Sequence, residues 1–184
     1  MPPEISIIVP VYNAALYLDE CVNSIMSQTF DNFELILCPG NSTDNSTELC
    51  NSWTDKDSRI KIVIQDNNNC AYARNKAIKA ASGKYIAFCD ADDAYCEDYL
   101  EKMYNKIKTD DSDLVECMFY VSGDDLAKRE IYDSLSLNRV FDHDMEERQG
   151  PPAIWKLILI EKYLPEVEGD KSINEILELM YKTF

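Results

Sequence analysis

The feature that most constrains the fold is an alternation of short apolar runs with segments of helical spacing. Each apolar run is rich in β-branched or aromatic residues, which is typical of a strand buried on both faces. Between the runs, apolar residues recur every three or four positions, which indicates amphipathic helices. This alternation predicts an α/β fold, a mostly parallel sheet flanked by helices on both faces. The predicted strands are residues 5–9, 33–38, 60–64 and 85–89, and the helices between and after them carry Leu18, Leu49, residues 71–81 and Leu100.

Polar residues and glycine suggest where these helices begin and end. Asn13 is predicted to cap the first helix, and Asp44 or Asn45 the second. Gly83 fits the position after the helix at 71–81, where a positive φ is favoured. Beyond about residue 110 the pattern loosens. There we expect a strand at 114–121 and helices at 154–163 and 173–181.

Charge and cysteine content exclude several classes of protein. The 184 residues suit one domain, 1–184, and carry 34 acidic against 18 basic side chains, a net charge of −16. This acidity argues against nucleic-acid binding, and an anionic ligand would need a cation as mediator. Seven cysteines with no C-x-x-C spacing, no signal peptide and no apolar run of about 20 residues predict a reduced, cytoplasmic protein. The single histidine disfavours a Ser-His-Asp triad or a histidine-rich zinc site.

An acidic string follows the predicted strand at 85–89. Asp90, Asp92 and Asp93 would lie at the carboxyl end of that strand, where doubly wound sheets bind their ligands. Three carboxylates this close repel one another unless solvent or a divalent cation separates them. The string is therefore either a cation site or an acidic surface turn that caps the next helix.

Six strings, in order and with matching spacing over residues 5 to about 108, resemble family 2 of the inverting glycosyltransferases. They are ISIIVPVYN at 5–13, QTFDNFELI at 28–36, STDNS at 42–46, ARNK at 73–76, GKYIAF at 83–88 and DADD at 90–93. The resemblance implies the GT-A fold and a nucleotide-diphosphate-sugar donor. It also implies Mn²⁺ or Mg²⁺ held by a D-x-D motif.

The resemblance assigns expected roles residue by residue. Asp90 would face the ribose or donor sugar, while Asp92, assisted by Asp93, would bind the metal. Tyr12 would pack beside the base, the alternative being a core tyrosine. Arg74 would contact the base or phosphate, the alternative being a helix-surface arginine. Pro10, in the loop before Tyr12, joins the expected donor site.

The chain departs from the family where the base is expected to bind. Family members commonly carry D-D-x-S after the second strand, whereas this chain has Cys38-Pro39-Gly40-Asn41-Ser42. Both acids are missing, so Gly40 contributes no carboxylate and Asn41 or a backbone carbonyl must substitute. We expect either a changed base preference or a donor binding that is weakened or lost.

The acceptor half shows only one candidate catalytic group. The family places its general base in an E-D pair opening a late helix, and Asp170, preceded by Gly169, is the nearest match. Asp170 could equally be a plain N-cap. We expect residues 1–110 to bind the nucleotide sugar and 111–184 to form a shortened acceptor half, because family chains usually continue well past such a helix.

Two classes of function remain open. The first is a metal-dependent enzyme that transfers a sugar, with inversion, to a glycan or lipid-linked acceptor, and that associates peripherally with a membrane. The second is a non-catalytic relative that has lost its donor-site acids and only binds. A nucleotidyltransferase is disfavoured, because the N-terminal region has no glycine-rich, basic phosphate loop.

Overall fold

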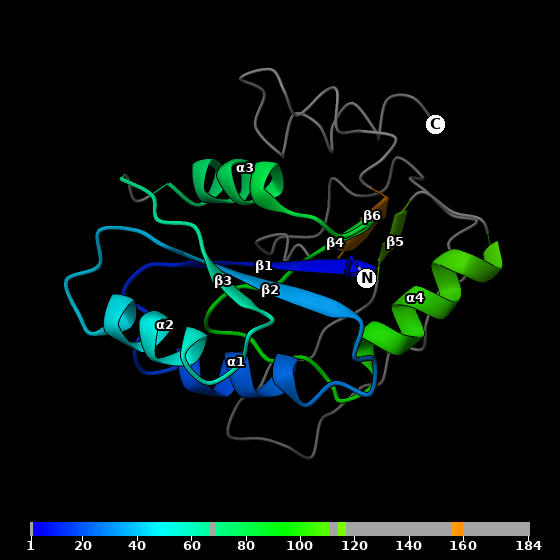
Figure 1. Cartoon of the computed structure of the whole chain (residues 1–184), viewed down its shortest axis with the longest axis horizontal. Helices are drawn as coiled ribbons and strands as arrows, with labels where there is room; N and C mark the ends of the chain where they lie inside the picture. The colour runs from blue at the N-terminus through cyan, green and yellow to red at the C-terminus, as the bar shows by residue number, and fades with distance from the viewer. Residues whose placement is uncertain (1, 67–68, 111–113, 117–155, 160–184) are drawn as a thin grey trace, which may run out of the picture.

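A computed structural model of the chain describes residues 2–66, 69–110, 114–116 and 156–159. Strands and helices alternate through the first hundred residues, as the apolar runs predict (Figure 1). None of the helices in this part of the chain has both the length and the apolar content needed to cross a bilayer. The elements are β1 (Ile5–Val11), α1 (Leu18–Met26), β2 (Phe33–Pro39), α2 (Ser46–Thr54), β3 (Ile60–Ile62), α3 (Cys70–Ala80), β4 (Tyr85–Phe88), α4 (Tyr99–Asp110), β5 (Leu114–Glu116) and β6 (Lys156–Leu159).

The described strands form one sheet in the order β3-β2-β1-β4-β6-β5. The first four run parallel, with Val11 beside Pro39, Ile8 beside Phe88 and Leu37 beside Ile62. β6 pairs antiparallel with both β4 and β5. The prediction of a mostly parallel α/β sheet is therefore confirmed. The carboxyl ends of β1 to β4 meet at one edge, which lies at the left of Figure 1.

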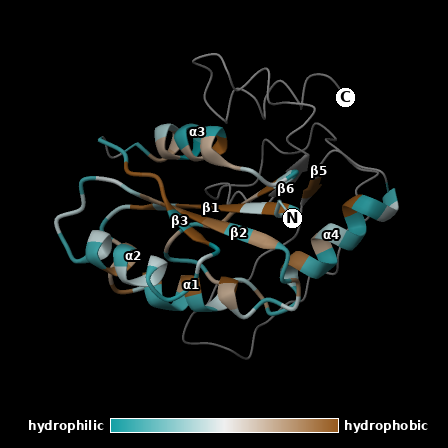
Figure 2. Ribbon diagram, viewed as in Figure 1, coloured by the Kyte–Doolittle hydropathy of each residue, from teal (hydrophilic) through white to brown (hydrophobic). Residues whose placement is uncertain are grey.

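Helices cover both faces of the sheet. Figure 1 shows α3 on one face and α1 and α2 on the other. The strands are the most apolar part of the molecule, and the polar residues gather on the outer helices (Figure 2). Alternate strand residues divide between the two faces. On β1, Ile5, Ile7, Val9 and Val11 join the main core with α1, α2 and α4, which leaves Ser6, Ile8 and Pro10 on the α3 face.

Two predictions about the helices are wrong. The segment predicted as a helix at 154–163 contains strand β6, because the free edge of β4 offers backbone partners there. Asn13 does not cap α1, which begins at Leu18 without a side-chain cap. For α2, Asp44 rather than Asn45 accepts a hydrogen bond from the first helical N–H, that of Ser46, at 3.0 Å.

Gly83 serves close packing rather than a positive φ. None of the described glycines has a positive φ. A Cβ on Gly83 would lie 2.6 Å from the Ser6 nitrogen and 2.7 Å from the Ile5 carbonyl carbon. The Gly83 N–H donates to Ser6 Oγ at 2.8 Å. The glycine therefore lets the turn before β4 lie directly against β1. The prediction that Gly83 ends the helix with a positive φ is wrong.

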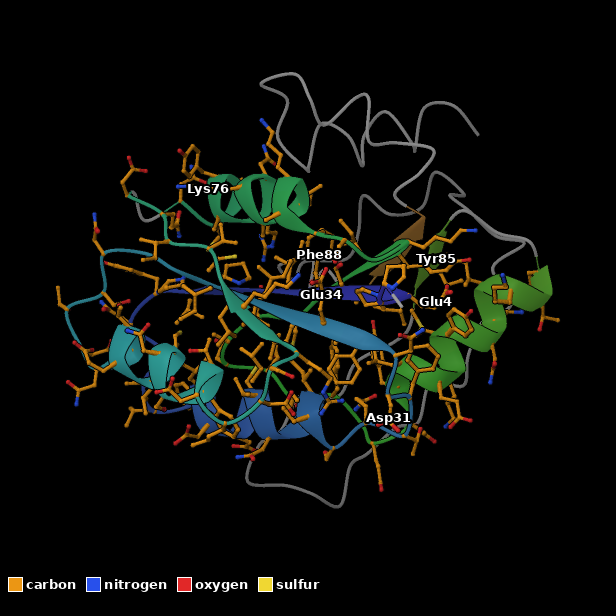
Figure 3. The ribbon with its side chains drawn as sticks, in the orientation of Figure 1. Glu4, Asp31, Glu34, Lys76, Tyr85 and Phe88 are labelled. Carbon is orange, nitrogen blue, oxygen red and sulfur yellow. The ribbon has the colours of Figure 1, made fainter. Side chains whose placement is uncertain are left out.

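Glu34 forms a buried polar cluster beside this turn, on the α3 face (Figure 3). Its Oε1 accepts hydrogen bonds from Ser6 Oγ at 2.6 Å and from the Ser82 N–H at 2.6 Å. Its Oε2 pairs with Lys61 Nζ at 2.5 Å. Burial opposes ionisation, but these bonds outweigh it and hold the pKa of Glu34 below its ordinary value. The cluster ties β1, β2 and β3 to the end of α3.

Candidate functional site

The loops that follow β1 and β2 are joined at the carboxyl edge of the sheet. Asn13 has a φ of 49°, and its Oδ1 accepts the Thr43 N–H at 2.8 Å. The Asn13 N–H donates to Ser42 Oγ at 3.1 Å, and the Ala15 N–H donates to Asp44 Oδ2 at 3.0 Å. These contacts fix the backbone on the C-terminal side of Tyr12.

Tyr12 lies in the first of these loops with 43% of its surface exposed. This exposure excludes the reading of Tyr12 as a core residue. An aromatic ring held at the rim of a sheet edge offers a planar apolar face to a ligand. The preceding Pro10 is buried near the end of β1, on the face that α3 covers.

Arg74 and Asp90 form the central ion pair of the edge. Arg74 Nη2 lies 2.5 Å from Asp90 Oδ1, which brings α3 against the residue that follows β4. Arg74 is 9% exposed, so the alternative of a helix-surface arginine is wrong. The Asp90 side chain keeps 41% of its surface exposed. Within the described residues the buried Arg74 Nε has no hydrogen-bond partner. The pair therefore leaves capacity for a ligand on both partners.

Asp92 and Asp93 lie in the turn that follows Asp90. Asp92 is exposed, while Asp93 is partly buried and donates its N–H to the Asp90 carbonyl at 3.0 Å. Burial and the neighbouring Asp92 and Asp90 carboxylates raise the pKa of Asp93 to about 6. The turn does not cap α4, which starts only at Tyr99.

These carboxylates fit a hard divalent cation in part. Burial and, after it, the neighbouring Asp92 and Asp90 carboxylates disfavour the charged form of Asp93, and a cation would offset both effects. Carboxylate oxygens are also the donors that such ions prefer. Across the described ranges, no three His, Cys, Asp or Glu side chains are grouped so that they could hold a metal ion. An ion here would therefore need further ligands, such as phosphate oxygens or water.

The end of β2 lacks the carboxylates that the family motif would supply. Gly40 is buried, and its N–H donates to the Val11 carbonyl at 2.9 Å. Asn41 is exposed, and its Nδ2 donates to the Asp66 carbonyl at 3.1 Å. Asn41 therefore ties the loop after β2 to the segment after β3.

Sequence analysis did not identify Gln65, which lies beside the end of β2, where these carboxylates are missing. Its N–H donates to the Pro39 carbonyl at 3.1 Å, so pairing with β2 continues beyond β3. The side chain of Gln65 is buried. Its position could have been predicted from the two-residue period of a strand, which places Gln65 on the same face as Lys61 and Val63 if the strand continues one residue past its predicted end.

Most of the described cysteines are buried and pack as small hydrophobic residues, whereas Cys70 and Cys96 are exposed. All the described cysteines are free, and Cys21, Cys38, Cys50 and Cys89 are buried. Burial raises the pKa of the Cys38 and Cys50 thiols to about 12, which excludes them as nucleophiles near neutral pH. Asp170, the predicted general base, lies outside the described residues, as does most of the segment 111–184.

A profile described as "Glycosyl transferase family 2" matches residues 6–161 of the sequence. The chain belongs to this family. Among its relatives, the glycosyltransferase GlyG of Streptococcus pneumoniae is 36% identical over 148 residues, which cover 73% of this chain. The Bacillus subtilis protein named uncharacterized glycosyltransferase EpsJ is 35% identical over 140 residues, or 76% of this chain. The matches span 49% of GlyG and 40% of EpsJ.

Solved structures support the same family 2 fold. Staphylococcus aureus TarS 1–349 in complex with UDP-GlcNAc matches with a TM-score of 0.60 and 30% identity, over 65% of this chain and 36% of the TarS 1–349 chain. The mannosyltransferase PcManGT of Pyrobaculum calidifontis, in complex with GDP-Man and Mn²⁺, has the same TM-score. At 23% identity, over 65% of this chain and 36% of that protein, it supports the GT-A fold alone.

Proposed function

We propose that this family 2 domain transfers a sugar from a nucleotide-diphosphate donor to a glycan or lipid-linked acceptor, with inversion and with a divalent cation. The observation that carries the proposal is the Arg74–Asp90 ion pair, which holds α3 against the residue that opens the acidic turn at the carboxyl end of β4. A structural neighbour that is 30% identical, TarS, binds UDP-GlcNAc. We further propose a cytoplasmic location, with peripheral association where a lipid-linked acceptor holds the enzyme at a membrane.

In this proposal the donor lies across the carboxyl edge of the sheet. Tyr12 packs on the base, and Pro10, Gly40 and Asn41 line the base end of the site. Arg74 holds the Asp90 carboxylate towards the ribose or donor sugar. Because the arginine is nearly buried, its charge acts on the donor through a weakly screening environment. The Arg74–Asp90 pair is thus the fixed point against which the donor is oriented.

Asp92, with Asp93, would hold Mn²⁺ or Mg²⁺ beside the donor diphosphate. A bound divalent cation there offsets the charge that develops on the departing nucleoside diphosphate. It also resolves the conflict between a chain of net charge −16 and an anionic substrate. Asp93 contributes fully only when it is ionised, which favours a pH above its pKa of about 6.

Transfer with inversion requires a general base on the acceptor side, and we assign this role to Asp170. The acceptor hydroxyl oxygen bonds to the anomeric carbon while the bond from that carbon to the diphosphate oxygen breaks, and the hydroxyl proton passes to the carboxylate. Asp170→Asn should leave donor binding intact and lower transfer about 10²–10⁴-fold. A variant that transfers or hydrolyses the donor at the parent rate would place the base elsewhere.

A thermal-shift titration tests donor and metal binding together. At 100 times its dissociation constant a nucleoside diphosphate should add about 2.7 kcal/mol of stability, which is roughly 5–10 °C in melting temperature for a chain of this size. We expect this shift with Mn²⁺ or Mg²⁺ and not with EDTA. Asp92→Ala should abolish it. An equal shift in EDTA, or an unchanged shift in the variant, contradicts a metal-mediated site.

One observation favours a second function, a non-catalytic binding domain. The missing acids at Pro39 and Gly40 remove side chains with which the family recognises the base. Hydrolysis of the donor by water separates the two functions without knowledge of the acceptor. If no donor that binds is hydrolysed, the binding function is the better description.

A further inference from the structure

Gln65 lies on the same side of the ligand edge as the proposed donor site. Side chains alternate along β3 and its continuation, and Lys61 contacts Glu34 on the α3 face of the sheet. Gln65, four residues further on, shares that face. Its N–H bonds to the Pro39 carbonyl at 3.1 Å, so its backbone lies beside the end of β2.

The side chain of Gln65 is only 3% exposed, yet its carbonyl oxygen is unsatisfied. Among the described residues, Gln65 Oε1 is buried and accepts no hydrogen bond. A buried acceptor without a partner is destabilising, and such groups are few in native proteins. The feature therefore calls for an explanation outside the packing of the free protein.

Gln28 shows how this chain treats a glutamine whose role is structural. Its exposure, 5%, is close to that of Gln65. Its Nε2 donates to the Ser24 and Cys96 carbonyls at 3.0 and 2.7 Å, and its Oε1 accepts the Leu100 N–H at 2.9 Å. The carboxamide of Gln28 is thus used at both ends, in contrast to that of Gln65.

Gln65 lies beside Pro39 and Gly40, the two positions at which the family motif would supply carboxylates to bind the base. Pro39 and Gly40 have no polar side chain, and the exposed Asn41 already donates to the Asp66 carbonyl. Gln65 neighbours Pro39 on the side of β2 opposite β1, and it brings a buried carbonyl oxygen that bonds to none of the described residues.

We propose that Gln65 is a specificity-determining residue that reads the hydrogen-bonding edge of the donor base in place of the missing carboxylate. The inference rests on the donor binding proposed above. A carboxylate only accepts hydrogen bonds and so selects bases that present an N–H. A carboxamide has an acceptor and a donor, and rotation exchanges them. Gln65 therefore suits both uracil, with its N3–H, and cytosine, with an N3 acceptor and an amino donor.

UDP and CDP are the probes, because their bases have nearly the same shape but exchange donor and acceptor at N3 and at the substituent on C4. Dissociation constants for both, and for inorganic pyrophosphate, are measured with Mn²⁺ on the full chain. The parent should bind UDP and CDP within about tenfold of each other. Gln65→Leu should weaken both by about tenfold, the equivalent of one hydrogen bond, and leave pyrophosphate binding unchanged. Gln65→Glu, measured at pH 8, should raise the preference for UDP over CDP at least tenfold.

Gln28→Leu is the matched control. It should lower the melting temperature without changing the affinity for UDP, because it breaks three internal hydrogen bonds, and none of them involves a residue assigned to the donor site. Gln65→Leu should melt at or above the parent temperature, since it removes an unsatisfied buried oxygen. Gln65→Leu should thus weaken UDP binding without loss of stability, and Gln28→Leu should lose stability without weakening UDP binding. A purely structural role for Gln65 would not produce this contrast.

The outcomes separate the two proposals. If the parent binds neither UDP nor CDP, the proposed function fails and this inference fails with it. If the parent binds them and both Gln65 variants keep the parent affinities and the parent ratio of UDP to CDP, the inference alone is overturned. A Gln65→Leu variant that loses pyrophosphate binding as strongly as UDP binding also overturns it, because the defect would then not concern the base.

Discussion

The close approach of Gly83 to β1 predicts a large cost for adding one methyl group. In Gly83→Ala the new Cβ would meet the Ser6 nitrogen at 2.6 Å and the Ile5 carbonyl carbon at 2.7 Å. Both atoms belong to β1, which is paired with β2 on one side and β4 on the other and cannot move aside. The turn at residues 82–83 must therefore retreat by roughly 0.8 Å to restore ordinary contact distances.

The retreat breaks two hydrogen bonds. These are the bond from the Ser82 N–H to the Glu34 carboxylate, at 2.6 Å, and the bond from the Gly83 N–H to Ser6 Oγ, at 2.8 Å. A bond to a charged group contributes about 1.5–3 kcal/mol and a neutral one about 0.5–1.5 kcal/mol. Overpacking alone costs about 1–3 kcal/mol, against a gain of about 0.4–1 kcal/mol from the stiffer unfolded chain. We expect a net loss of about 2–7 kcal/mol.

Urea denaturation, with Ser82→Ala as control, measures this loss. The control removes only the 2.8 Å bond from Ser82 Oγ to the Glu34 carboxylate and should cost about 1.5–3 kcal/mol. Gly83→Asn distinguishes the reasons for the glycine, because asparagine tolerates a positive φ but has a Cβ. It should destabilise at least as much as alanine. A Gly83→Ala protein within 1 kcal/mol of the parent would refute the argument from close packing.

Three further predictions concern ionisation and loop geometry. Burial and like charges raise the pKa of Asp93 to about 6, so ionisation of Asp93 destabilises the native state. In metal-free buffer Asp93→Asn should therefore have a higher melting temperature than the parent. The difference should grow between about pH 4 and pH 6 and stay constant at higher pH. The pKa of Glu34 is lowered, so ionised Glu34 stabilises the native state above pH 4.5, the ordinary pKa of glutamate, and this stabilisation is lost on acidification. The difference in the free energy of unfolding in urea between the parent and Glu34→Gln should be largest near neutral pH and shrink below pH 4.5. Asn13→Ala should lose about 1–2 kcal/mol in thermal unfolding through its φ of 49°, while Asn13→Gly should lose less; equal losses would show that only the hydrogen bonds matter.

The parallel half of the fold is predictable because its strands are buried on both faces. Runs such as Ile5–Val11 read as strands without further information, and the short connections then dictate a parallel sheet. β6 was missed because its own sequence does not identify it as a strand. Its apolar residues fit helical and extended spacing equally well, and the open edge of β4 decided between them. Gly83 was misread because sequence does not tell a glycine needed for its φ from one needed for space.

The candidate site divides along a similar line. The position of Asp90 follows from the strand that precedes it, so the acidic turn was predictable at the ligand edge. The contact with Arg74 was not, because it depends on where α3 crosses the sheet. Gln65 escaped notice because the predicted strand ended before it, whereas the backbone continues to pair as far as the Pro39 carbonyl.

The position of β6 has a consequence for the order in which the sheet is completed. β6 comes after β5 in the chain, yet it lies between β4 and β5 and is the only one of the described strands with which β5 pairs. During synthesis, the second edge of β4 therefore stays open until Leu159 has been made, and an open strand edge is a site of wrong pairing. The closing strand arrives from far along the sequence, which slows folding more than it lowers stability. The strand that carries the acidic turn is thus the last of the parallel strands to gain its full set of partners.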